Sequence, residues 1–523
     1  MSRSRRLSRT VRALLVFPLA LACALVVGAV PAAQAATYVA ITGTGSTWSQ
    51  NALDQWKKTV GNNYGMTINY TGSGSSAGRK DYISGIVDFA VSEIPFQAHP
   101  EDGSAAEIPP RGYAYMPIVA GGTAFMYNLE IGGKRVTNLR LSGETITKIF
   151  TGKITNWNDI AIKADNPGLA MPDKPIVPVL RSDGSGSTAQ FTLWMSKQFP
   201  ALWSAFCGCS GLTSQYPGFG NAKLQTGSSG VAGYVAQDYG QGAITYVEYS
   251  YAVEAGFPVV KVLNSSGYYV EPTAPSVAVA LLQAQINEDP SSENYLTQIL
   301  DGVYNASDTR AYPLSSYSYM IVPTEVGGTF TLEKGATLGK FAQYILCEGQ
   351  QQAPALGYSP LPYNLVEAGA RQITRIPGAG DTGFDINNCR NPTFNPGDSS
   401  GSNLLAQTAP QPADCDKKGA SQCSTGTGGA TQGTTTSGGT QNSSSGTGAG
   451  GTSNSGGNAV YDENGALVSG GLNGAVAVSS PFTLKDPGFG PQGWIMIVAV
   501  LLLVGGIVLP PLLSRRLKGT GPK

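Results

Sequence analysis

The sequence predicts an α/β protein whose globular part has two lobes. Between residues 36 and 377, short β-type runs alternate with helix-like segments, which is typical of sheets with mostly parallel strands. This part is roughly 340 residues long, more than one hydrophobic core usually supports, so two lobes are expected. Glycine- and serine-rich loops separate several strands from the helices that follow them. Such loops form the ligand crevice of open α/β sheets.

The expected elements follow one another in a strand, loop and helix order. The predicted strands lie at residues 38–41, 66–70, 87–91, 176–180 and 243–247. The predicted helices lie at residues 49–60, 77–86, 188–195 and 231–237. The strands are short and mainly apolar, and each helix follows a loop that contains serine or threonine, the residues that cap helix starts.

Four of these loops share one plan and lie at residues 43–48, 72–78, 184–187 and 226–230. A helix start leaves backbone N–H groups without intrahelical partners, next to the positive end of the helix dipole. Glycine lets a ligand approach that backbone, and serine hydroxyls add donors. A single loop of this kind is usually only a cap. Several of them after strands, with Arg181 beside the third, indicate a site that surrounds a tetrahedral oxyanion.

The charge distribution argues against a nucleic-acid partner. The chain has 34 basic and 34 acidic residues, but residues 1–35 and 514–523 hold nine of the basic ones and no acid. The remaining 25 basic residues face 34 acidic ones, so the middle of the chain is acidic. A nucleic-acid binder needs the opposite sign, whereas a small anion can still be held by local donors.

Enzyme interpretations find little support in the residues. Residues 74–78 match the G-x-S-x-G nucleophile elbow, but that chemistry needs a base, and the single histidine, His99, lies in a polar loop. A nucleotide P-loop motif does not occur. One histidine and the close pair Cys207 and Cys209 argue against a zinc site. The sequence therefore predicts a binding protein with no catalytic residues, no metal and no cofactor.

The two ends of the chain predict export and a membrane anchor. Residues 1–35 have a basic start, an apolar core and a small-residue cleavage site, so they are expected to be a signal peptide removed before Ala36. A lipoprotein signal at Cys23 and an uncleaved anchor are the alternatives. Residues 493–513 are apolar enough for a transmembrane helix, and the basic tail 514–523 would lie in the cytoplasm. The expected location is the extracellular face of the plasma membrane.

A linker is expected between the globular part and that anchor. Residues 378–458 contain cysteines and then become rich in Gly, Ser, Thr and Gln, so a flexible spacer is predicted from about residue 395. Residues 459–492 form a membrane-proximal segment whose role the sequence leaves open. Besides Cys23 the chain has six cysteines, which in an exported protein indicate disulfides, with fifteen pairings possible.

Taken together, several of these segments resemble one protein family. Residues 43–48, 70–95, 181–187 and 242–249, with the closing segments 311–314 and 356–362, are similar in order to the phosphate-binding protein of bacterial phosphate ABC transporters. The resemblance covers about residues 40 to 375. It implies a type II-like, two-lobed periplasmic-binding-protein fold that closes by a hinge. Lobe 1 would comprise residues 36–118 and 311–377, and lobe 2 residues 119–310.

The resemblance also implies a set of phosphate ligands: Thr47, Trp48, Ser75, Glu93, Arg181, Asp183, Ser185, Gly186 and Ser187. Arg181 would pair with the anion while Asp183 holds the guanidinium, and the other residues would donate from three helix starts. The family usually has Phe and Thr where Trp48 and Ser187 stand. It places Asp at the position of Glu93, as the carboxylate that accepts the phosphate proton and repels sulfate.

The function implied is that of an extracytoplasmic, membrane-tethered binding protein. It would capture inorganic phosphate and pass it to ABC permease subunits in the membrane. Two alternatives remain open at this point. The chain could be a cell-surface sensor or interaction protein that serves no transporter, or it could bind another oxyanion such as sulfate or molybdate.

Overall fold

The computed structural model describes residues 38–100, 103, 105–292, 294–380, 384–399, 401, 403–431, 460–461 and 467–469. The predicted signal peptide at residues 1–35 and the basic tail at 514–523 lie outside the described residues. The predicted membrane-proximal segment at 459–492 is described only at residues 460–461 and 467–469, where β16 (Val460–Tyr461) and β17 (Leu467–Ser469) pair as a two-stranded sheet.

An eight-stranded mixed sheet forms the centre of the body, in the order β2-β1-β3-β15-β4-β10-β8-β9. Its strands are β1 (Ile41–Gly45), β2 (Ile68–Thr71), β3 (Phe89–Ser92), β4 (Tyr113–Tyr127), β8 (Val177–Arg181), β9 (Lys223–Gln225), β10 (Ala243–Glu248) and β15 (Ser315–Pro323). The strands at each end, β2-β1-β3 and β10-β8-β9, run parallel within their group. The sheet therefore has a parallel group on each side of an antiparallel centre.

The long strand β4 joins the two groups. Residues 113–122 of β4 pair antiparallel with β15, which in turn pairs with β3. Residues 123–127 of β4 pair antiparallel with β10. The change of partner falls between Gly122 and Thr123, so one strand carries the hydrogen-bonded ladder from the first parallel group into the second.

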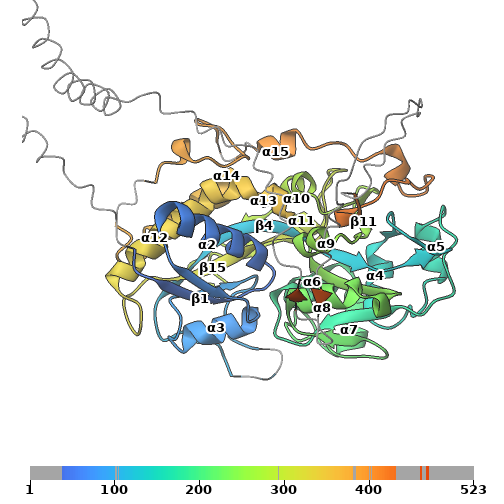
Figure 1. The fold of residues 1–523 in the computed structure, drawn as a ribbon, viewed down its shortest axis with the longest axis horizontal. Helices are drawn as coiled ribbons and strands as arrows, with labels where there is room; N and C mark the ends of the chain where they lie inside the picture. The colour runs from blue at the N-terminus through green and yellow to red at the C-terminus, as the bar shows by residue number, and fades with distance from the viewer. Residues whose placement is uncertain are drawn as a thin grey trace, which may run out of the picture. The chain divides into compact units, whose positions relative to one another are not determined.

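The helices that follow the parallel strands carry the site. They are α2 (Gln50–Tyr64), α3 (Ser75–Ile83), α6 (Gly186–Gln198), α8 (Gly227–Ala236) and α9 (Tyr249–Ala255). Figure 1 shows α2 and α3 on opposite sides of β1. Because each helix follows a strand of a parallel group, its N-terminus lies at the carboxyl end of that strand, where ligands of open α/β sheets bind.

The remaining described elements surround this framework. Smaller strands are β5 (Glu130–Ile131), β6 (Lys134–Arg135), β7 (Arg140–Leu141), β11 (Lys261–Leu263), β12 (Tyr269–Val270), β13 (Gln285–Ile286) and β14 (Gln298–Ile299). Further α-helices are α4 (Gly143–Phe150), α5 (Ile160–Asp165), α7 (Pro200–Cys207), α10 (Ala274–Leu281), α11 (Asp301–Tyr304), α12 (Leu332–Leu346), α13 (Ala353–Leu356), α14 (Tyr363–Ile373) and α15 (Leu404–Gln407). Short 3₁₀ helices are η1 (Asp238–Gly240), η2 (Glu348–Gln352), η3 (Ile386–Asn388), η4 (Asp414–Asp416) and η5 (Gly428–Thr431).

The first strand differs from its predicted position for a packing reason. It was expected at residues 38–41, with residues 43–48 as a loop, but β1 begins at Ile41 and ends at Gly45. A Cβ at Gly43 would lie 2.3 Å from the Phe89 ring, and one at Gly45 would lie 2.1 Å from the Val91 carbonyl oxygen. The glycines therefore let β1 pack closely against β3, in addition to opening the loop.

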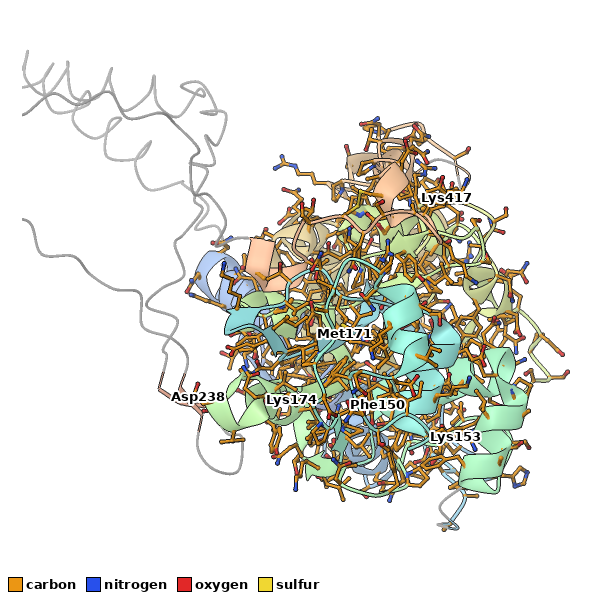
Figure 2. The ribbon with its side chains drawn as sticks, turned by 90° about the vertical axis from the view of Figure 1, so that its right-hand side faces the viewer. Phe150, Lys153, Met171, Lys174, Asp238 and Lys417 are labelled. Atoms are coloured by element: carbon orange, nitrogen blue, oxygen red, sulfur yellow. A yellow bond between two sulfur atoms is a disulfide. The ribbon has the colours of Figure 1, made fainter. Side chains whose placement is uncertain are left out.

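The linker prediction is wrong over its first part. A flexible spacer was expected from about residue 395, but the described residues between 384 and 431, here called the C-terminal extension, form short helices that pack on the body. Helix α15 lies beside α10 (Figure 1). In the view of Figure 2, Lys417 of the extension lies at the opposite end of the body from Lys153. Composition alone misled the prediction because covalent and ionic contacts hold this segment.

Three disulfides pair the six cysteines of the body and the extension. Cys347 at the end of α12 bonds Cys389 of the extension, Cys415 bonds Cys423, and Cys207 bonds Cys209. The predicted presence of disulfides is confirmed, and the structure supplies the pairing that the sequence left open. The Cys347–Cys389 bond fastens the start of the extension to the body.

The predicted fold class is wrong in its last element, a C-terminal transmembrane helix. The longest described helices, α2 and α12, have 15 residues each, shorter than the approximately 20 residues that span a bilayer. Within the part of the chain that the structure describes, no helix has the length and hydropathy to cross a membrane. The predicted helix at residues 493–513 lies outside that part.

Candidate anion-binding site

The starts of four helices meet through hydrogen bonds between their side chains and backbone. Ser75 at the start of α3 accepts a bond of 3.2 Å from the N–H of Gly186 at the start of α6. Thr47, just before α2, accepts a bond of 3.1 Å from the N–H of Ser228 in the first turn of α8. The four loops predicted to share one plan therefore lie together in the folded chain.

Glu93 is the centre of the first group of contacts. Its side chain is 1% exposed and accepts three hydroxyl hydrogen bonds. Oε1 accepts from Ser46 and, at 2.6 Å, from Ser318, while Oε2 accepts from Ser75 at 2.7 Å. A Cβ at Gly186 would lie 1.9 Å from Oε2, so this carboxylate lies directly against the first residue of α6. Only glycine fits at that helix start.

Arg181 and Asp183 form the second group. The guanidinium is buried and makes a two-pronged ion pair with Asp183, through Nε to Oδ1 at 2.7 Å and through Nη2 to Oδ2. Burial alone would raise the pKa of Asp183, but the hydrogen bonds and charge of Arg181 outweigh it and hold this pKa below its ordinary value. The ion pair leaves Nη1, which lies 3.5 Å from the Ser228 hydroxyl, as a donor on the side of α8.

The two groups are joined at Ser46 and Thr47. Ser46 contacts Glu93, whereas the Thr47 hydroxyl lies 2.9 Å from the hydroxyl of Ser228, next to Arg181. Asp183 also accepts a bond of 3.0 Å from the N–H of Gly227, so α8 is tied to the ion pair. The arrangement combines one guanidinium, several hydroxyls and the positive ends of four helices, which suits a tetrahedral anion.

Three further predicted residues lie in the same helix starts with different roles. Ser185 caps α6, its hydroxyl accepting a bond of 3.2 Å from the N–H of Thr188. The buried hydroxyl of Ser187 has no hydrogen-bond partner within the described residues. Trp48 is buried with its ring against Tyr358, and its backbone N–H donates to the Ser46 hydroxyl at 2.9 Å. The Ser187 hydroxyl is therefore a free donor, while the backbone N–H of Trp48 already donates to Ser46.

The enzyme motif and the metal hypothesis find no supporting geometry. Ser76, the serine of the G-x-S-x-G match, hydrogen-bonds Ser214 at 3.3 Å and accepts a bond of 3.3 Å from Arg79. His99 is exposed and separate from that serine's contacts. Among the residues that the structure describes, no cluster of histidine, cysteine or acidic side chains is suited to a metal.

Matches to known proteins identify the family of this chain. A family model described as the PBP superfamily domain matches residues 30–348, more than half of the chain. A phosphate-binding protein, PstS, of Xylella fastidiosa strain Temecula1 is 33% identical over 337 residues, which cover 64% of this chain and 85% of that relative. The chain belongs to the phosphate-binding proteins of this superfamily.

Other phosphate-binding proteins match the chain at lower sequence identity. The phosphate-binding protein PstS of Haemophilus influenzae is 30% identical over 343 residues, covering 65% of this chain and 94% of that protein. A solved phosphate-binding protein from Stenotrophomonas maltophilia is 18% identical, covers 64% of this chain and 93% of its own, and superposes with a TM-score of 0.48. That structural likeness is too distant to support an argument about the site.

Three side chains of this phosphate-binding family member escaped the sequence prediction: Ser46, Ser228 and Ser318. Ser46 and Ser228 lie in two of the predicted loops, at residues 43–48 and 226–230. The sequence indicated these loops but not which serine in each would contact the site. Ser318 comes from β15, more than 200 residues from Glu93 in the chain. Nothing in the local sequence indicates that contact, because it depends on the return of the chain into the central sheet.

Proposed function

We propose that this member of the phosphate-binding family captures inorganic phosphate at the four helix starts. The observation that carries the proposal is that buried hydrogen bonds join the helix starts, with Ser75 contacting the N–H of Gly186 and Arg181 contacting Ser228. Backbone N–H groups, hydroxyls and a guanidinium are the donors that phosphate oxygens require. The related proteins named as phosphate-binding support the same ligand. Those relatives are named as binding proteins rather than enzymes, and the chain captures its ligand without changing it.

Glu93 gives this site a means to distinguish phosphate from sulfate. A carboxylate accepts hydrogen bonds and donates none, so it favours an oxyanion that still carries a proton. Phosphate retains a proton near neutral pH, whereas sulfate has none and meets a repelling charge. Glutamate in place of the family's aspartate adds one methylene, and the contact of Oε2 with Gly186 fits that longer reach.

Access to the site requires the two parallel groups of strands to separate. Glu93, Ser185, Ser228 and Arg181 are all at most 3% exposed, so a phosphate ion cannot reach them in this arrangement. The groups are linked through β4, which changes partner between Gly122 and Thr123. Bending of β4 at this change of partner would provide the hinge for opening and closure.

Calorimetric titration of the purified chain with phosphate and then sulfate, at pH 7 to 8, tests this function. Phosphate is expected to bind tightly and sulfate to give no heat. The Glu93→Gln variant should bind sulfate measurably, because the repelling charge is gone. A folded chain that binds sulfate or molybdate but not phosphate would instead be a receptor for that oxyanion.

Delivery to ABC permease subunits completes the proposed function. Three disulfides support a location outside the cytoplasm, where an uptake receptor works. Co-purification of permease subunits with the tagged chain from phosphate-starved cells tests the partnership. Normal phosphate uptake in a deletion strain, with no permease recovered, would favour a sensor or interaction protein that uses the same site.

A further inference from the structure

We propose that Ser318 is a positioning residue for the selectivity between phosphate and sulfate. Together with Ser46, it fixes one carboxylate oxygen of Glu93. This inference rests on the proposed function of the site. The Ser318 hydroxyl is fully buried and donates to Glu93 Oε1 at 2.6 Å from β15, a strand outside all four helix starts. Its one hydrogen bond in the described contacts is the bond to this carboxylate.

Ser46 supplies the second fixed donor to the same oxygen. Its Oγ already accepts from the N–H groups of Trp48, at 2.9 Å, and Ser49, at 3.4 Å. A serine hydroxyl has one proton and two acceptor positions, so the proton of Ser46 is left to point at Glu93. The start of α2 thus dictates the direction of this bond.

These two bonds make the oxygens of Glu93 unequal. A carboxylate oxygen has two lone-pair positions, and Ser46 and Ser318 occupy both of those on Oε1. Oε2 has one donor, Ser75, and lies against the start of α6. The free lone pair of Oε2 is therefore the one available to a proton on the bound anion, and the saturated Oε1 cannot take up that proton without breaking a bond.

The backbone near Ser318 and Glu93 is held in place by neighbouring elements. The pairing of β15 with β4 shifts register between Ser318 and Tyr319, where β4 has one extra residue, Ile118. The carbonyl of Glu93 accepts bonds from Gln190 at 2.7 Å and Gln298 at 3.1 Å. Main chain and side chain of Glu93 are thus fixed from α6, β14 and β15 together.

The consequence is a carboxylate that points one way. Without Ser318, Oε1 keeps a single donor, so the side chain can turn. A turned Glu93 holds phosphate less well and repels sulfate less strongly. The ratio of the two affinities is therefore the property that Ser318 controls.

The experiment compares Ser318→Ala with Ser316→Ala in the full chain. Ser316 lies in the same strand, is also buried and has a hydroxyl with no partner in the described residues, so it is a matched control. Competition titrations give the ratio of the sulfate and phosphate dissociation constants. Ser318→Ala should lower this ratio at least about tenfold, the effect of one hydrogen bond to a charged group, whereas Ser316→Ala should change it less than about twofold. Arsenate, which also keeps a proton, should follow phosphate.

Two outcomes would overturn the inference. If Ser318→Ala weakens phosphate and sulfate by the same factor, Ser318 is only structural. If its effect on the ratio persists in a Glu93→Gln background, it does not act through the carboxylate. Should Ser318→Ala fail to fold, Ser318→Cys keeps the size with a weaker donor and should give a smaller loss of selectivity. A wild-type chain that binds neither anion would refute the proposed function itself, a result distinct from an unchanged ratio.

Discussion

The helix starts around Glu93 and the C-terminal extension are both rich in glycine, serine and threonine, yet they use those residues differently. At the helix starts, hydroxyls and N–H groups face one another across chain segments and converge on a buried carboxylate and guanidinium. In the extension, the polar groups bond outward to the backbone of the body. Thr393, for example, donates to the Leu361 carbonyl at 2.9 Å. The first pattern makes a site, and the second makes an attachment.

The attachment is distributed along the whole extension. Cys389 is bonded to Cys347, Arg310 donates to the carbonyl of Ala406 at 2.9 Å, and Lys261 pairs with Asp416 at 2.7 Å. The buried hydroxyl of Thr427 bonds the Val259 carbonyl. A segment too polar to build its own core is thus ordered by contacts with an existing one. Bonding partners, rather than composition, therefore decide whether such a segment is fixed.

Removing the Cys347–Cys389 disulfide should have the largest effect on stability and none on the site. The bond closes a separation of 42 residues, so the double serine variant should lose about 4 kcal/mol by the loop-entropy estimate. The Cys415–Cys423 bond closes only 8 residues, for which the same estimate gives about 2.5 kcal/mol. Denaturant unfolding measures both. Loss of phosphate binding in a folded variant without Cys347–Cys389 would show that extension and site are coupled.

Arg181→Ala should damage both stability and binding, because one ion pair serves both. Removing the guanidinium leaves the largely buried carboxylate of Asp183 without its main partner, at a cost of about 3 kcal/mol in unfolding free energy. Anion affinity should fall by about 2 kcal/mol or more. The double variant Arg181→Ala with Asp183→Asn should regain stability but not affinity. Recovery of affinity by the second substitution would mean that Arg181 does not contact the anion.

Asp416→Ala should loosen the extension by a smaller amount. It leaves the Lys261 ammonium, whose side chain is 11% exposed, without its ion-pair partner. The nearby Glu271 compensates in part, so we expect a loss of about 2 kcal/mol rather than the larger cost of an isolated buried charge. Limited proteolysis should then cut the extension while phosphate titrations stay unchanged. Asp414→Ala, an exposed aspartate in the same 3₁₀ helix, is the control and should remain resistant.

The helix starts could be predicted from the sequence because their signals are local. Loops such as residues 184–187 carry the cap, the glycine and the neighbouring Arg181 within a few positions. Their meeting point followed from the rule that helices begin at the carboxyl ends of parallel strands. Of the nine predicted site residues, Trp48 differs most in its contacts, because Ser46 takes its N–H. Their roles as phosphate ligands remain predictions.

The rest depended on contacts distant in sequence, which no local pattern encodes. Ser318 reaches Glu93 only because β15 returns between β3 and β4, a pairing that no local sequence pattern encodes. The extension looked like a spacer because Asp416 and Thr427 find their partners more than 150 residues away. The extent of β1 was misjudged because Gly43 was taken as a loop residue rather than as a close contact with Phe89.

Glu248 lies between the helix starts and the C-terminal extension. Removing its charge is expected to change stability less than the substitutions above. One carboxylate oxygen accepts a bond of 2.7 Å from the N–H of Ser250 at the start of α9, the helix on whose far end η5 of the extension packs. The other oxygen has no partner, and a Cβ at Gly121 would lie 2.9 Å from it and 2.8 Å from the Trp48 ring. Burial raises the pKa of Glu248 well above its ordinary value of 4.5.

This raised pKa makes the folded state less stable as pH rises. Below pH 4.5 the carboxyl is protonated in both states, so it contributes no pH dependence. Above pH 4.5 the unfolded chain releases the proton while the folded chain keeps it, which lowers the unfolding free energy by about 1.4 kcal/mol per pH unit until the folded pKa is reached. Glu248→Gln keeps the acceptor for Ser250 and removes this penalty.

Glu248→Gln should therefore be more stable than the wild type by about 1 kcal/mol or more at pH 7, with a difference that vanishes near pH 4.5. Unfolding curves of both proteins at several pH values between 4.5 and 8 measure this difference. Glu254 and Glu271 also have raised pKa values, but they are common to both proteins and cancel in the comparison. A constant difference across the pH range would assign the effect to packing against Trp48 instead of to the buried charge.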